Sequence, residues 1–199
     1  PAPDAPGSKQ VAALMTITGL IDAPKADKEF LSINGAQGFS TFYGYYMLEA
    51  MATAGNYQGA LDVIREYWGA MIDLGATSFW EDFDINWIPN AVPIDELVPE
   101  GKKDIHGDCG AYCYVGFRHS LCHGWASGPT SWLSRHILGV EVIEPGCRQV
   151  RITPHLGDLK WVKGTFPTPY GEIQIYHEKQ ANGNVISEVK APKGVSVIK

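Results

Sequence analysis

The chain has 199 residues, of which 45% are hydrophobic and 19% charged, a composition typical of a globular protein with a packed core. Its formal net charge is −6 and its Lys and Arg residues form no cluster, which argues against nucleic acid or an anionic membrane as a partner. No apolar run is long enough to cross a bilayer, and residues 1–8 lack the basic and apolar regions of a signal peptide. The sequence therefore does not encode a compartment.

The first half of the chain has the apolar spacing of helices. A first helix is expected from Ser8 to about Gly19, followed by a surface loop over residues 24–29. Residues 40–54 are apolar around nearly the whole helical wheel, which predicts a helix buried on all sides. Residues 57–74 follow the i, i+3, i+4, i+7 pattern of an amphipathic helix. A short turn joins these two helices, so we expect a helical hairpin of the kind that builds concentric helical barrels.

The spacing of apolar residues changes in the second half of the chain. Residues 76–118 show little helical spacing and contain several Pro and Gly residues, and a loop of this length is usually functional. A further helix is expected from about Ser127 to Gly139. Beyond it, apolar and polar residues alternate in short runs, and Asn182-Gly183 is typical of a hairpin turn. Residues 140–199 are therefore predicted to form an antiparallel β-domain.

The segment GATSFWEDFD, which begins at Gly75, carries the residues best suited to chemistry. Glu81 is a carboxylate next to an aromatic residue, Trp80. A carboxylate suits general-base work on water, and a flat ring suits the apolar face of a sugar. Asp82 and Asp84 are rival acids, either of which could instead hydrogen-bond a backbone turn. The alternative interpretation of the whole segment is an acidic loop with a packed Trp.

The four cysteines permit disulfides without demanding them in a chain of this size. The two Cys and two His ligands of a zinc finger are mimicked, in the same order along the chain, by Cys109, Cys113, His119 and His123. The gap between the second Cys and the first His is far shorter than the roughly 12 residues of a finger, so small buried thiols are the preferred interpretation. His106 and Asp108 could line a pocket or bind a cation. No metal and no cofactor is expected.

Two motifs, GATSFWE at residues 75–81 and SLCHGWASGPTSWL at residues 120–133, resemble the bacterial α-L-rhamnosidases of the inverting (α/α)6-barrel type. The order of features also fits that family, from the helical hairpin to a Gly-x-Ile-x-Ile strand at residues 171–175. The resemblance covers most of the chain. It implies an α+β fold in which residues 1–139 are the last helical hairpins of a partial (α/α)6 barrel with a long active-site loop. Residues 140–199 would then be a small C-terminal antiparallel β-sandwich domain.

The resemblance also implies roles for individual residues. Glu81 falls on the position of the family's general base, and His123 matches its substrate-contacting histidine. A neutral imidazole can hydrogen-bond a sugar hydroxyl, although a histidine at a helix entrance can also be a core residue. The further candidates for substrate binding are Trp80, Trp87, Trp125 and Asp82, with barrel packing as the alternative for each Trp. Trp132 is assigned to the core.

The implied function is that of the C-terminal part of an inverting glycosidase that removes terminal α-L-rhamnose from a glycan or glycoside. Residues 1–74 contain no acidic, Arg-containing motif like the one that supplies the family's general acid, and the helices are too few to close a six-hairpin ring. The remainder of the same polypeptide's barrel is thus the expected partner, and a periplasmic or secreted parent enzyme would fit. The alternatives are a non-catalytic carbohydrate-binding or interaction module and another (α/α)6 inverting hydrolase.

Overall fold

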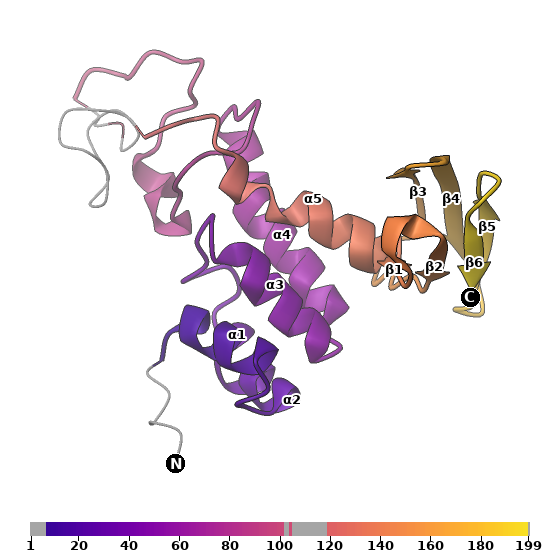
Figure 1. Ribbon diagram of the computed structural model, residues 1–199. Coiled ribbons are helices and arrows are strands. Elements are labelled where there is room, and N and C mark those ends of the chain that lie inside the picture. The colour runs from indigo at the N-terminus through magenta and orange to yellow at the C-terminus, as the bar shows by residue number, and fades with distance from the viewer. Residues whose placement is uncertain (1–6, 102–103, 105–118, 199) are drawn as a thin grey trace. The chain divides into compact units, whose positions relative to one another are not determined.

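The computed structural model describes residues 7–101, 104 and 119–198 (Figure 1). The chain divides into two compact units, residues 1–129 and residues 130–199. Helices make up the regular structure of the first unit, and the described strands all lie in the second. The α+β class predicted from the sequence is thereby confirmed, whereas the proposed domain boundary at residue 139 stays a prediction.

Short 3-10 and π-helices lie among the regular α-helices (Figure 1). Those of the first unit are α1 (Lys9–Ile17), α2 (Ala23–Ala26), the π-helix η1 (Asp27–Leu31), α3 (Gly44–Thr53), α4 (Tyr57–Asp73) and the 3-10 helices η2 (Ile85–Asn90) and η3 (Gly124–Ala126). The last helical stretch consists of α5 (Gly128–Trp132) and the π-helix η4 (Leu133–Ile137).

The predicted surface loop over residues 24–29 is wrong, because this segment is helical in α2 and η1. The side chain of Asp22 accepts a hydrogen bond from the backbone N–H of Lys25 at 3.0 Å, and Pro24 lies in the first turn. An acidic N-cap followed by proline is a normal way to begin a helix. The charged residues of this segment concealed that start signal.

Helices α3 and α4 form the predicted hairpin. Gly55, at φ +79°, ends α3, and the side chain of Asn56 caps α4 by accepting the N–H of Gly59 at 2.9 Å. A methyl group added to Gly44 would lie 2.7 Å from the ring of Trp68, so a residue without a side chain is needed where the two helices meet. The place of this hairpin in a larger helical barrel stays a prediction.

The second unit contains two three-stranded sheets, with strand orders β1-β2-β6 and β3-β4-β5. The strands are β1 (Val140–Val142), β2 (Gln149–Ile152), β3 (Trp161–Thr168), β4 (Gly171–Lys179), β5 (Val185–Lys190) and β6 (Ser196–Ile198), and the 3-10 turn η5 (Pro145–Cys147) connects the first two. All pairs are antiparallel except β2 with β6, which is parallel. The prediction of a wholly antiparallel domain is wrong for that pair, because the chain leaves the second sheet after β5 and joins the first sheet alongside β2.

Both sheets contribute to one apolar core in this unit. Its fully enclosed members are Leu138, Val140, Val150, Ile152, Ile173 and Ile175. His177 is also completely buried, and its Nε2 lies 3.1 Å from the carbonyl oxygen of Leu138. Since a carbonyl only accepts, Nε2 carries the proton, and Nδ1 accepts the hydroxyl of Ser187 at 2.7 Å. Both ring nitrogens are satisfied, as a buried polar side chain requires.

Candidate active site

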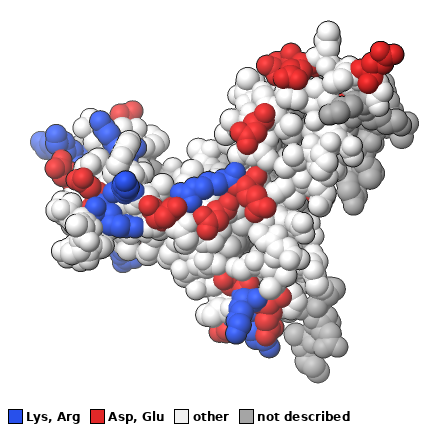
Figure 2. Space-filling view, turned by 180° about the vertical axis from the view of Figure 1, so that it is seen from behind, with Lys and Arg blue, Asp and Glu red and all other residues white. Residues whose placement is uncertain are grey.

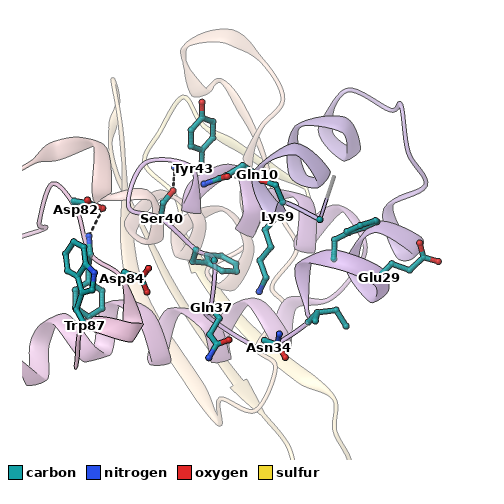
Figure 3. Close-up of a pocket in the computed structure, with 17 residues that line it drawn as sticks. Lys9, Gln10, Glu29, Asn34, Gln37, Ser40, Tyr43, Asp82, Asp84 and Trp87 are labelled. Carbon is teal, nitrogen blue, oxygen red and sulfur yellow. Dashed lines mark hydrogen bonds between the residues drawn. The ribbon is translucent and has the colours of Figure 1, made fainter. Parts of the chain in front are cut away.

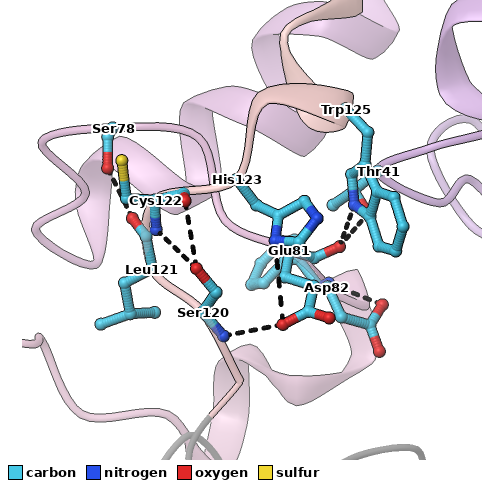
Figure 4. A network of polar contacts seen from close by, with 10 residues as sticks. Thr41, Ser78, Glu81, Asp82, Ser120, Leu121, Cys122, His123 and Trp125 are labelled. Carbon is cyan, nitrogen blue, oxygen red and sulfur yellow. Dashed lines mark hydrogen bonds and ion pairs between the residues drawn. The ribbon is translucent and has the colours of Figure 1, made fainter.

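The two sequence motifs lie side by side, although about 40 residues separate them along the chain (Figure 4). The N–H of Glu81 donates to the carbonyl of Ser120 at 2.8 Å, and the N–H of His123 donates to the carbonyl of Phe79 at 2.7 Å. These backbone bonds join the Trp-Glu loop to the Ser-x-x-His loop in an antiparallel sense. We refer to residues 78–81 and 120–123 as the paired loops.

The carboxylate of Glu81 lies at the centre of the paired loops. Its Oε2 accepts the backbone N–H of Ser120 at 2.8 Å and lies 4.0 Å from Nδ1 of His123. The side chain of Glu81 is 20% exposed and that of His123 is 32% exposed, so both reach solvent. Within the described part of the chain, no hydrogen bond goes to the other carboxylate oxygen, Oε1. The carboxylate is thus oriented through one oxygen while the second can meet a water molecule.

The main chain of Glu81 is held from several directions. Its carbonyl accepts the hydroxyl of Thr41 and the indole N–H of Trp125, the latter at 2.8 Å. Thr41 is buried, and it belongs to a segment that lies 40 residues before Glu81. Two segments that are distant in the sequence, at residues 41 and 125, therefore hold this one carbonyl group.

Trp125 connects the backbone of Glu81 to an exposed aromatic cluster. Its ring lies 4.2 Å from the ring of His123 and 5.6 Å from that of Phe42, with centroids as reference points. Tyr43 and Tyr46 extend the cluster through edge contacts with Phe42. Trp125 is 48% exposed despite these contacts. A half-exposed indole beside a carboxylate and an imidazole can pack against the apolar face of a sugar.

The residue after Glu81 lines a pocket of about 770 Å³, a size common for small-molecule sites (Figure 3). One wall consists of Asp82, Asp84 and Trp87, and the opposite wall comes from α1 and the segment that follows η1. Trp87 is only 8% exposed, so it presents a small part of its ring to this space. The lining combines acids, amides, hydroxyls and rings, a mixture that suits a polar ligand with apolar faces.

Burial raises the pKa of the Asp82 carboxyl above its usual value, because the charged form loses hydration. The N–H of Phe83, which donates to Asp82 at 2.9 Å, and the charge of His119 oppose this shift. The negative charges of Asp84 and Glu81 add to it. Because its carboxyl accepts the backbone N–H of Phe83, Asp82 holds a backbone turn, which is the alternative role considered for it from the sequence.

Lys9 is a buried member of the pocket wall that the sequence analysis missed. Its ammonium group donates to the carbonyl of Gly35 at 2.5 Å and lies 5.1 Å from the centre of the Phe39 ring. Glu66 holds the same segment by accepting the N–H of Ala36 at 2.9 Å. The signal was present in the sequence, since Lys9 starts the i, i+3, i+4, i+7 stripe whose other members, Ala12, Ala13 and Thr16, are buried.

Burial lowers the pKa of Lys9 from its usual 10.5 to about 8, although Glu66 and Asp27 oppose the shift. At a pH between about 8 and 10.5, Lys9 is protonated to a greater extent in the unfolded chain than in the folded chain. The contribution of Lys9 to the free energy of unfolding should therefore rise as the pH increases from about 8 to 10.5. We expect Lys9→Met to flatten that rise in urea unfolding measured across this range. Lys25→Met, which replaces an exposed lysine, is the matched control, and an equal flattening in both variants would contradict the assignment.

The structure places Trp80 in the core instead of at the surface. It is fully buried and its ring lies 5.9 Å from that of Phe83, so it presents no exposed ring face to a sugar. Trp80 therefore matches the alternative interpretation of this segment, an acidic loop with a packed Trp. Trp132 is also fully buried, as predicted.

Some of the other candidate residues lie outside the described part of the chain. These are His106, Asp108, Cys109 and Cys113. Cys122 and Cys147 are free thiols, the first of them exposed. Over residues 7–101, 104 and 119–198, no three His, Cys, Asp or Glu side chains are grouped as metal ligands would be. In the same residues no helix has the length and apolarity that crossing a membrane requires.

The paired loops thus place a carboxylate, held by a backbone N–H, beside an imidazole and an exposed indole. A family comparison concerns a different part of the chain. Residues 139–198 match the family described as the bacterial alpha-L-rhamnosidase C-terminal domain. Over residues 139–198 the chain is therefore similar to the C-terminal domain of the bacterial α-L-rhamnosidases. No curated protein sequence matches it.

Solved structures with the same fold cover 96% of the chain. The GH78 family rhamnosidase of Bacillus sp. GL1 is 27% identical, with a TM-score of 0.71. The α-L-rhamnosidase of Aspergillus terreus is 20% identical with a TM-score of 0.73, and that of Streptomyces avermitilis, in complex with L-rhamnose, is 18% identical with a TM-score of 0.70. The chain spans 18%, 21% and 18% of these three proteins, respectively, or about a fifth of their length.

Proposed function

We propose that this chain supplies the general-base side of the active site in an inverting α-L-rhamnosidase. The observation that carries the proposal is the carboxylate of Glu81, which is held through Oε2 by the N–H of Ser120 and lies 4.0 Å from His123. In this proposal the chain forms the last hairpins of an (α/α)6 barrel and its C-terminal β-domain. The general acid comes from a part of the barrel outside these 199 residues.

The proposed reaction is a single displacement at the anomeric carbon. Glu81 accepts a proton from a water molecule as the water oxygen attacks that carbon, and the bond to the leaving oxygen breaks on the opposite face. A second carboxyl group, about 6.5–9.5 Å from Glu81, gives its proton to the leaving oxygen. The product sugar then has the inverted anomeric configuration.

The neighbours of Glu81 have supporting roles in this proposal. His123 hydrogen-bonds a hydroxyl of the rhamnose, and the exposed ring of Trp125 packs against the apolar side of the sugar. Trp125 also fixes the carbonyl of Glu81, so one side chain serves both binding and alignment. Asp82 and Trp87 line the adjoining pocket, where they would contact the sugar or the group attached to it.

The proposal predicts that the isolated 199-residue chain does not hydrolyse rhamnosides. Inversion needs an acid and a base on opposite sides of the bond, and this chain is assigned only the base. The measurement is release of nitrophenol from nitrophenyl α-L-rhamnoside by the purified chain. If the unaltered chain releases nitrophenol and an identically prepared Glu81→Gln chain does not, the proposed division of roles between this chain and the rest of the barrel is refuted.

The substrate class is tested on a longer protein that contains this chain, with a panel of chromogenic glycosides. Hydrolysis confined to the α-L-rhamnoside, with inversion followed by NMR, is the expected result. Hydrolysis of a different glycoside would assign the chain to another inverting enzyme. An inactive protein that still binds rhamnose-containing saccharides would assign it to a non-catalytic binding module.

A further inference from the structure

The outer face of the β3-β4-β5 sheet forms a second candidate binding surface, in the unit that does not contain Glu81. Side chains alternate along β3, and on β4 the inward Ile173 and Ile175 belong to the core. The outward side chains border an open groove of about 860 Å³. The strand register sets its residues in two neighbouring rows, Lys163, Tyr176 and Glu188 in one and Thr165, Gln174 and Lys190 in the other. We refer to this surface as the sheet groove.

The sheet groove ends at an exposed indole. Trp161, the first residue of β3, lines the groove and is 60% exposed, whereas Val162, the next residue, faces the core. The register places Trp161 opposite Glu178, two positions from the pair formed by Lys163 and Tyr176. An amphipathic ring at the mouth of a groove offers a large rigid contact area to a ligand with an apolar face. The groove thus has an aromatic anchor beside polar side chains.

The charges of the sheet groove differ from those of the chain as a whole. Two lysines and one glutamate line it, whereas the whole chain has a formal net charge of −6. In the part of the chain that the structure describes, neither Lys163 nor Lys190 forms an ion pair. Glu188 lies in the same row as Lys163, so the groove is not uniformly basic. Figure 2 shows Lys and Arg interspersed with Asp and Glu on the face that it presents.

We propose that the sheet groove binds a saccharide that carries carboxylate groups. The apolar face of one sugar ring packs on Trp161, and the ammonium groups of Lys163 and Lys190 bind carboxylates. Gln174 and Thr165 offer both donors and acceptors, which matches the dual character of sugar hydroxyls. Glu188 accepts from hydroxyls and disfavours a ligand with dense negative charge, such as a polyphosphate. The sheet groove shares no residue with the paired loops, and binding there does not depend on hydrolysis.

The proposal is tested by calorimetric titration of the 199-residue chain with tetragalacturonate, and with its methyl ester as a neutral ligand of the same shape. We expect the acid to bind more tightly than the ester, with an affinity that falls as salt is added. Trp161→Ala should weaken binding by about tenfold or more, the usual effect of removing an aromatic anchor. The double variant Lys163→Gln, Lys190→Gln should bind the acid and the ester about equally.

Lys193→Gln, which removes an exposed lysine that does not line the sheet groove, is the matched control and should leave the affinity unchanged. All replaced side chains are exposed, so a thermal melt should confirm that each variant is folded. Three results would overturn the proposal: no binding of either saccharide, binding that Trp161→Ala leaves intact, or equal binding of an acidic peptide. Equally tight binding of the methyl ester by the unaltered chain would show that the carboxylates are not recognised.

Discussion

Replacing Glu81 by glutamine is expected to lower kcat of the proposed rhamnosidase by about 10²–10⁴-fold, the usual contribution of general-base catalysis. Glutamine keeps the size of the side chain and can still accept the N–H of Ser120 through its amide oxygen. It cannot accept a proton from water. Because the change affects the transition state more than the bound substrate, KM should change little. Steady-state kinetics on a protein that contains the whole barrel provides the measurement.

Asp82→Asn is the matched control for this experiment. Asp82 accepts the N–H of Phe83, and asparagine can keep that bond through its amide oxygen. Its effect on kcat should therefore be clearly smaller than that of Glu81→Gln. Azide added to a Glu81→Ala enzyme should restore part of the turnover, since a small anion can enter the vacated space and attack from the same face. A larger loss in Asp82→Asn than in Glu81→Gln would show that Asp82 is the base.

Replacing Trp80 by alanine is expected to lower the free energy of unfolding by about 3–5 kcal/mol, the usual range for a large aromatic residue in a core. Trp80 is fully buried, and its ring packs edge-on against Phe83. Phe83 also lies against Tyr67, whose hydroxyl donates to the carbonyl of Phe83. A cavity at Trp80 would therefore loosen the packing beneath the Trp-Glu loop.

Denaturant unfolding of the 199-residue chain measures this effect, with Trp125→Ala as the comparison. Trp125 is half-exposed and its loss leaves less of a cavity, so the destabilisation should be smaller. Since Trp80 has no exposed ring face, Trp80→Phe should preserve more of the stability than Trp80→Ala does. If Trp80→Ala is as stable as the unaltered chain, Trp80 is not a core residue and its predicted role in sugar binding would return.

Much of the helical part of the fold could be predicted because its signals are local. The hairpin of α3 and α4 follows from apolar period, from Gly55 and from the cap at Asn56. The errors arose where a local signal was ambiguous or where distant segments decide. Helix α2 begins with Asp22 and Pro24 in a segment whose charges are also typical of a loop. The parallel pairing of β2 with β6 depends on a return of the chain that no short pattern encodes.

The candidate site was predictable in its residue types and not in its contacts. The motif resemblance pointed to Glu81, His123 and Trp125, which the structure brings together. Nothing in the sequence around Trp80 distinguishes a buried indole from an exposed one, because a neighbouring acid is compatible with both. The hydrogen bond from Thr41 to Glu81 joins segments 40 residues apart, so only the folded chain reveals it.

The hydrogen bond from Thr41 has a mechanical consequence. Ser40 lines the pocket, and the next residue, Thr41, holds the carbonyl of Glu81. One peptide bond therefore separates a residue of the pocket wall from the residue that holds the backbone of Glu81. In the proposed rhamnosidase, a substrate shortened at the end that occupies this pocket is therefore expected to lose turnover as well as affinity.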